Sequence, residues 1–399
     1  MDVQPIVQRG QPSLLLRDPL QLSGNYLVLP EELGPALALL ARCDGLTLNE
    51  LRMQAMASFG LVYPDELLQQ MVEVLDDNFM LDNARAAEAH DRALAAYRAA
   101  PFRPPSLAGQ SYPAKPADLR RLFDGYLSRV NGASRAAPAA GRGLFSPHID
   151  YQRGGSVYAA VWQQAASMAQ AADLVILLGT DHHSQGDRLT LTRQSYATPY
   201  GVLPTDRALV DALAEAIGPQ AAFAGELRHR AEHSLELVAT WLHHMRGGRP
   251  VAMVPILTGS FADFIDGQGD PADDAVLAAF LATLRQQAWT AGRQVLVVAS
   301  GDLAHVGPVF GGAEVDAAGR AALGQADEEL MQQLAAGSAV GFFAAIRRVE
   351  DRNNVCGASP FYLALRLLGE VEGQVVAYDQ CPADQRNTSL VSVCGMVFG

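Results

Sequence analysis

Cysteine is scarce in this sequence. Its 399 residues contain four cysteines without any CxxC pair, namely Cys43, Cys356, Cys381 and Cys394. Scattered thiols fit a reducing compartment better than a disulfide framework. The first ten residues, MDVQPIVQRG, also lack the apolar segment after a basic start that marks a signal peptide. For a bacterial source, these two absences predict a cytoplasmic protein.

Long apolar runs and an excess of positive charge are missing as well. No apolar stretch approaches the ~20 residues of a membrane span, so no membrane segment is predicted. Lysine and arginine total 30 against 43 aspartates and glutamates, which gives a formal net charge of −13. Because phosphate recognition requires a basic surface, this charge argues against a nucleic-acid partner.

Several sequence motifs of common enzyme classes are absent. The glycine pairs Gly154-Gly155 and Gly311-Gly312 match neither the P-loop nor the dinucleotide-binding fingerprint. The GxSxG motif of many serine hydrolases does not occur. These absences disfavour a nucleotide-dependent enzyme and weaken the case for a serine hydrolase.

Residues 1–85 are predicted to form a small α+β domain. Two short strands, 14–18 and 25–30, precede three helical segments, and 78–82 is a candidate for a returning strand. Thr47 and Glu50 have the spacing of a capping box at the start of the second helix. This order resembles the winged-helix, peptide-binding PqqD-like domains, with a generic α+β cap as the alternative. The segment 86–107, rich in alanine and then proline, is predicted to be a linker.

Residues 108–399 alternate between apolar strands and amphipathic helices. The main strand candidates are 144–149, 174–179, 188–194, 251–258 and 295–300. This alternation predicts an α/β fold with a mostly parallel or mixed central sheet and helices on both faces. Two terminal candidates, 375–379 and 389–399, are expected to add antiparallel edge strands.

Three predicted strands end in histidine and aspartate. The central example is LVILLGTDHH, where a buried run reaches Gly179 and then Asp181, His182 and His183. The other two ends carry His148 with Asp150, and Asp302 with His305. In open α/β sheets ligands bind at the carboxyl ends of the strands. Histidine with carboxylate suits Fe, Zn or Cu, so one site for a divalent transition metal is predicted.

Each candidate also has a purely structural interpretation. His148 could be an ordinary hydrogen-bonded residue at a strand end, and Asp302 could cap a helical turn. Of the adjacent His182 and His183, we expect one metal ligand and one supporting donor or acid/base group.

Four more candidates lie elsewhere in the chain. His233 opens an amphipathic helix and could be a surface residue, while Glu232 and Glu236 beside it could be ligands, general bases or partners of the helix dipole. Cys356 is expected to be a small buried packing residue rather than a nucleophile.

The motifs, taken together, resemble the Memo family, also named AmmeMemoRadiSam system protein B. They occur in the family's order and span 108–399: AGQSYPAKPADLR, SPHIDYQRGG, LLGTDHH, TPYGVLPTD, EHSLELVATWL, PVAMVPILTG, SGDLAHVG and NNVCGASP. The resemblance implies a fold similar to the class III extradiol, LigB-type dioxygenases. It implies that His148 and His182 line a metal site, that His233 is a further cleft histidine, and that Asp302 and His305 form a polar pair.

One departure from the family concerns the metal. Animal members carry a cysteine ligand just before the last of these histidines, and Ala304 stands there in this chain. The difference puts a soft thiolate site for Cu(I) in doubt and favours a hard or borderline metal.

These observations lead to a functional prediction. The protein is expected to be a metal-dependent redox enzyme, with His148, His182 and His233 as ligands and iron as the first candidate before zinc or copper. The predicted catalytic residues are His183, His233, His305 and Asp302. The resemblance implies a radical SAM enzyme and an AMMECR1-type protein as partners, and the substrate would be a small molecule or a peptide. The alternatives are a non-catalytic peptide- or ligand-binding protein and metal-assisted hydrolysis with Glu232 or Glu236.

Overall fold

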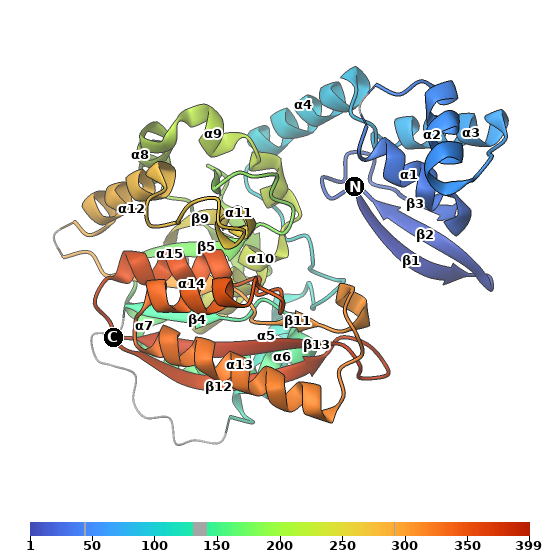
Figure 1. Cartoon of the computed structure of the whole chain (residues 1–399). Helices are drawn as coiled ribbons and strands as arrows, with labels where there is room; N and C mark the ends of the chain where they lie inside the picture. Colours follow the sequence, from blue (N-terminus) through green and yellow to red (C-terminus); the bar gives the residue numbers. More distant parts are fainter. Residues whose placement is uncertain (44, 131–141, 291) are drawn as a thin grey trace. The chain divides into compact units, whose positions relative to one another are not determined.

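The computed structural model describes residues 1–43, 45–130, 142–290 and 292–399. Contacts within the chain divide it into two compact units, Met1–Ala99 and Ala100–Gly399. The division falls inside the segment 86–107 that the sequence predicts to be a linker. Figure 1 colours the chain from blue at the N-terminus to red at the C-terminus.

The first unit combines a three-stranded antiparallel sheet with helices. Its strand order is β1-β2-β3, and its elements are β1 (Asp2–Gln8), β2 (Gln11–Arg17), β3 (Tyr26–Pro30), η1 (Glu31–Leu33), α1 (Gly34–Leu40), α2 (Leu48–Phe59), α3 (Asp65–Asp77) and α4 (Ala84–Ala99). The predicted capping box is confirmed, because Thr47 accepts the Glu50 N–H at 3.3 Å and Glu50 accepts the Thr47 N–H at 2.8 Å.

This unit differs from the prediction at two places. The strand β1 is not predicted from the sequence, because its residues are almost all exposed and it lacks the alternation of buried and exposed positions that indicates a strand. The predicted strand 78–82 does not form. Phe79 has φ of 58°, a left-handed conformation that interrupts an extended chain.

The second unit contains a mixed eight-stranded sheet, which confirms the predicted α/β class. The order is β11-β13-β4-β10-β5-β9-β6, with β12 paired to β13. The strands are β4 (Gly143–Ser146), β5 (Leu174–Thr180), β6 (Leu189–Leu191), β9 (Ala252–Thr258), β10 (Val295–Ser300), β11 (His305–Val306), β12 (Gly373–Pro382) and β13 (Leu390–Phe398). The four central strands β4, β10, β5 and β9 are parallel.

The last two strands run antiparallel as predicted, but only one of them is an edge. β13 pairs with β4 on one side and with β12 on the other, and all nine of its residues are buried. β12 lies outside it. The continuous apolar sequence of β13 reflects this interior position, since a strand covered on both faces shows no alternation.

Helices cover both faces of the sheet (Figure 1). On β5, Leu174 and Ile176 face one hydrophobic core, whereas Val175 and Leu177 face the other. The first core is completed by α8 (Arg207–Ile217), α12 (Ala275–Ala288), α13 (Ala317–Ala335), α14 (Ala339–Arg348) and α15 (Ala358–Leu368). The second is completed by α5 (Pro116–Leu127), α6 (Tyr151–Gln164), α7 (Ala166–Ala171) and α10 (His233–Met245).

Short elements fill the connections of the second unit. They are β7 (Tyr196–Thr198), β8 (Gly201–Leu203), α9 (Pro219–Phe223), η2 (Glu226–Arg230), α11 (Ala262–Ile265) and η3 (Pro308–Phe310). Among the described residues, no helix is both long and apolar enough to span a lipid bilayer.

A buried carboxyl group on α13 gives the fold a testable pH dependence. Asp327 has no exposed surface, and the Tyr378 hydroxyl donates to its Oδ2 at 2.7 Å. Burial raises the pKa of Asp327 to about 6 from its usual 3.8. The folded protein therefore holds this proton more tightly than the unfolded chain does, and stability falls as pH rises between these two values.

We predict that Asp327→Asn stabilises the protein above pH 6, because the amide accepts the same hydrogen bond without a buried charge. The gain in unfolding free energy at pH 7.5 should be of the order of 3 kcal/mol and should shrink toward pH 4. Chemical denaturation at several pH values measures it. An equal effect of the substitution at pH 4.5 and pH 7.5 would contradict the assignment.

Candidate metal centre

The site begins with three parallel strands that end at the same level. Ser300 of β10 is in register with Ser146 of β4 on one side and with Gly179 of β5 on the other. The next residues of each chain segment therefore leave the sheet at one edge. They bring His148, His182 and Asp302 to the same place, as the sequence predicts.

Helix α10 adds a second group of side chains. Its start approaches the end of β5 so closely that a Cβ on Gly179 would lie 2.7 Å from the Ser234 hydroxyl oxygen. That hydroxyl donates to the Thr180 carbonyl at 2.7 Å, and the Ser300 hydroxyl donates to the Ser234 carbonyl at 2.5 Å. These contacts fix Glu232 and His233, the cap and first residue of α10, beside the strand ends.

The loop between α14 and α15 contributes the thiol of Cys356. The Cys356 sulfur lies 3.2 Å from His148 Nε2 and accepts the Asp302 N–H at 3.3 Å. The Thr180 hydroxyl donates to the Cys356 carbonyl at 2.9 Å. The next residue, Gly357, donates its N–H to the Asp302 carbonyl at 2.9 Å, so the loop is joined to two of the three strand ends.

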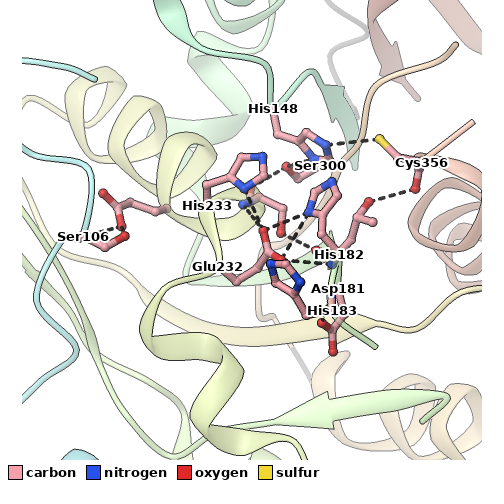
Figure 2. A network of polar contacts seen from close by, with 12 residues as sticks. Ser106, His148, Asp181, His182, His183, Glu232, His233, Ser300 and Cys356 are labelled. Atoms are coloured by element: carbon pink, nitrogen blue, oxygen red, sulfur yellow. Dashed lines mark hydrogen bonds and ion pairs between the residues drawn. The ribbon is translucent and has the colours of Figure 1, made fainter. Parts of the chain in front are cut away.

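Among the residues that the structure describes, three sets of three side chains have their potential ligand atoms within 4.8 Å of one another. They are His148, His182 and Cys356; His182, Glu232 and His233; and Asp302, His305 and Cys356. The sets share His182 and Cys356, so they form one continuous cluster. Figure 2 shows the histidine rings gathered between Glu232 and the thiol.

His148 is the buried member of the histidine group. Its backbone N–H donates to Asp302 Oδ1 at 2.8 Å, which makes Asp302 a support for the loop as well as a neighbour of the ring. Burial, together with the nearby His182 and His233, holds the pKa of His148 well below its usual range. A neutral imidazole of this kind has a lone pair available for a metal.

Glu232 organises the other two histidines. Its side chain is 2% exposed and lies 3.1 Å from His182 Nδ1 and 3.0 Å from His233 Nδ1. It also accepts the N–H groups of His182 and Ser234, each at 3.0 Å. Burial alone would raise the pKa of Glu232, but the two histidines keep it well below its usual range.

The contact with Glu232 also determines how His182 can bind a metal. Because Nδ1 faces the carboxylate, Nε2 is the ring nitrogen left for an ion. Burial would lower the pKa of His182, but Glu232 and the contact with Cys356 raise it well above its usual range. An ion bound at this residue would therefore displace a proton.

The remaining predicted residues lie at different distances from the centre. His305 joins it through the third set, and its Nδ1 lies 3.0 Å from the Asn354 carbonyl. His183 belongs to none of the three sets, and its N–H donates to Asp181 Oδ1 at 3.1 Å. Asp150 is not in any of these sets either. It caps α6 by accepting the Arg153 N–H.

The sequence does not indicate the position of the thiol, since it predicts a packing role for Cys356 and, from Ala304, puts a thiolate site in doubt. In the structure the Cys356 sulfur comes from another loop to a place where it could bind an ion, whereas Ala304 is buried in a small apolar cluster. The only local signal was the position of Cys356 just before a glycine and a helix, which does not distinguish a ligand from a core residue.

Glu236 has a structural role rather than a catalytic one. It forms a fully buried ion pair with Arg103 and accepts the Leu107 N–H at 2.8 Å and the Tyr112 hydroxyl at 2.5 Å. Arg103 also donates to the Glu232 carbonyl at 3.0 Å. This pair therefore holds the backbone that carries Glu232, and no oxygen of Glu236 is left to activate water.

A cavity of about 390 Å³ opens onto the centre. His182 and Cys356 form part of its lining, together with residues of α11 and of the loop between α14 and α15. A molecule in this cavity would lie against two of the possible metal ligands.

Comparison with known proteins shows that the chain is similar to Memo-like proteins over most of its length. The family model for Memo-like proteins matches residues 103–397. A MEMO1 family protein of Aquifex aeolicus is 26% identical over 100% of this chain and 98% of its own length. A MEMO1 family protein of Thermus thermophilus is 26% identical over 84% of this chain and 94% of its own length.

The buried pair beneath α10 yields a prediction about stability. Arg103→Met leaves Glu236 charged and unpaired in the interior and should lower the unfolding free energy by about 3–5 kcal/mol. Adding Glu236→Gln removes the stranded charge and keeps an acceptor, so the double variant should recover part of the loss. Chemical denaturation measures both, with Arg120→Met, an exposed arginine, as the control. A loss below 1 kcal/mol for Arg103→Met would show that the pair does not anchor α10.

Proposed function

Since the chain belongs to the family of Memo-like proteins, we propose that it is a metal-dependent redox enzyme that binds its ion through His148, His182 and Cys356. The observation that supports this most strongly is the 3.2 Å approach of the Cys356 sulfur to His148 Nε2, with His182 in the same set. Side chains from three separate segments of the chain converge there. No local sequence pattern in any of these segments predicts that they meet.

The chemistry of the donors fits a transition metal. Two imidazole nitrogens and one thiol are borderline or soft ligands, which suit iron, copper or zinc and do not suit magnesium or calcium. Burial raises the pKa of Cys356, so the thiol holds its proton until an ion replaces it. Iron stays the first candidate, with zinc and copper as alternatives.

A bound redox-active metal would supply electron transfer to or from a molecule in the adjoining cavity. The chain's own residues would bind and orient that molecule and handle protons. Glu232 fixes Nδ1 of His233, so Nε2 of His233 is the atom that could take up or release a proton. His305 donates its Nδ1 proton to the Asn354 carbonyl, which leaves its Nε2 as an acceptor in the set that it forms with Asp302 and Cys356.

The contacts of Glu232 disfavour metal-assisted hydrolysis. Its two oxygens already face two backbone N–H groups and two histidine rings. A carboxylate engaged in this way is a poor base for activating water.

The proposal retains the finer predictions from the sequence. A LigB-type dioxygenase is the model for a metal at the strand ends, and a radical SAM enzyme and an AMMECR1-type protein are the proposed partners. The first unit supports the proposal of a partner protein, because α2 exposes three apolar side chains at a spacing of three residues: Met53, Met56 and Phe59. We propose that it is a PqqD-like peptide-recruiting module.

Elemental analysis of protein purified without chelator tests the metal site. We expect near-stoichiometric metal in the wild type and loss of most of it in His148→Ala, His182→Ala and Cys356→Ser, because each removes one ligand. His90→Ala and Cys43→Ser, both in the first unit, are the matched controls and should retain the metal.

Two further variants distinguish between the overlapping ligand sets. His233→Ala and Glu232→Gln should weaken binding less than Cys356→Ser does, because they support His182 rather than contact the ion. Full metal content in Cys356→Ser, with loss in His233→Ala, would instead place the ion between His182, Glu232 and His233. A wild type that takes up no metal under anaerobic loading would favour a non-catalytic binding protein.

A further inference from the structure

We infer that the cavity beside His182 and Cys356 selects a small organic cation, an amine-like or amidine-like group attached to an apolar body, as the substrate. The inference rests on the proposed function, because it assigns a substrate class to the same site. It depends on the charge, shape and position of the cavity rather than on the identity of the metal.

The position of the cavity makes it the substrate side of the centre. Its lining includes His182 and Cys356, which belong to the same ligand set, as well as Thr180 at the end of β5. His148, the third member of the set, is 1% exposed and lies behind them. A molecule that reaches the centre through this cavity therefore meets His182 and Cys356 first.

The charged groups around the cavity are all acidic apart from His182. Four carboxyl groups line it, those of Asp181, Asp266, Glu350 and Asp351, and neither lysine nor arginine does. Asp181 is neutralised by Arg228, whose Nε lies 2.7 Å from its Oδ2. In the part of the chain that the structure describes, no ion pair forms at the other three, so the cavity keeps an uncompensated negative charge.

The loop that carries two of these carboxyl groups, those of Glu350 and Asp351, has a strained backbone. Glu350, Asp351 and Asn354 have φ values of 52°, 43° and 51°, which place three non-glycine residues of one short loop in the left-handed region. Such conformations persist where surrounding contacts hold them, and they concentrate at functional sites. Here the Asn354 amide donates to the His305 carbonyl at 3.1 Å, and Asp351 accepts the Val355 N–H at 2.9 Å.

Apolar side chains line the cavity as well. Phe261 precedes α11, Ile265 ends it and Val355 precedes the thiol, so the cavity offers hydrocarbon surface beside its carboxyl groups. The volume of about 390 Å³ is within the range of small-molecule sites and far exceeds the needs of a single metal ion. A cavity with both acidic and apolar side chains fits a ligand that has a cationic head and a hydrocarbon body.

The test uses three planar probes of nearly equal shape: benzamidine, which is cationic at neutral pH, neutral benzamide and anionic benzoate. Their affinities for the zinc-loaded full-length protein are measured by ligand-observed NMR. Benzamidine should bind at least tenfold more tightly than benzamide, and benzoate should bind most weakly. The preference should shrink at high salt, because Asp266 and Glu350 are exposed.

A pair of matched variants tests the residues. In Asp266→Asn/Glu350→Gln, benzamidine should bind about fivefold more weakly and benzamide should change by less than twofold, as expected for two exposed charges. Glu215→Gln/Glu372→Gln changes the net charge equally at exposed acids outside the cavity and should behave like the wild type.

Three results would overturn the inference: equal binding of benzamide and benzamidine to the wild type, no effect of the Asp266/Glu350 substitutions on benzamidine affinity, or a loss of metal from the Asp266→Asn/Glu350→Gln variant with its benzamidine affinity unchanged. The last result would mean that the carboxylates serve the ion. Failure of the proposed function looks different, because the wild type would then prefer benzamidine while holding no metal.

Discussion

The candidate metal centre depends on the register of three parallel strands. β4, β10 and β5 are hydrogen-bonded so that Ser146, Ser300 and Gly179 stand side by side at the end of the sheet. A shift of one residue in β10 would move Asp302 away from the His148 N–H and turn its side chain to the other face. The apolar cores on both faces prevent such a shift, because every residue of β5 and β10 is buried. The packing of the fold thus fixes the positions of the polar residues at its edge.

Buried charges then hold the segments that the strands do not reach. Arg103 with Glu236 secures the start of α10, and Arg228 with Asp181 secures the turn after β5. Pairs of this kind add little net stability, because the loss of hydration offsets the attraction between the charges. Their effect is geometric. They specify where Glu232 and His182 stand, and these two residues decide which histidine nitrogens face the centre.

The sequence predicts the fold class, the parallel strands and the convergence of His148, His182 and Asp302. A buried apolar strand and the residues that follow it can be recognised from a short stretch of sequence. The sequence does not predict the partners of those residues. Cys356 lies eight residues after the end of α14, and only the docking of its loop against Asp302 reveals that the thiol faces His148. Glu232, the cap of α10, and Glu236, inside that helix, cannot be distinguished from the sequence. In the structure Glu232 contacts histidines and Glu236 contacts Arg103. The first strand was missed because exposed residues carry no periodic signal.

X-ray absorption spectroscopy of the metal-loaded protein tests the central claim most directly, because it identifies the atoms bound to the ion. The account predicts one sulfur and at least two imidazole nitrogens around the metal, at about 2.3 Å and about 2.0–2.1 Å if the ion is zinc. The sulfur signal should disappear in Cys356→Ser. A spectrum of the wild type with only nitrogen and oxygen neighbours would contradict the account and place the ion with His182, Glu232 and His233.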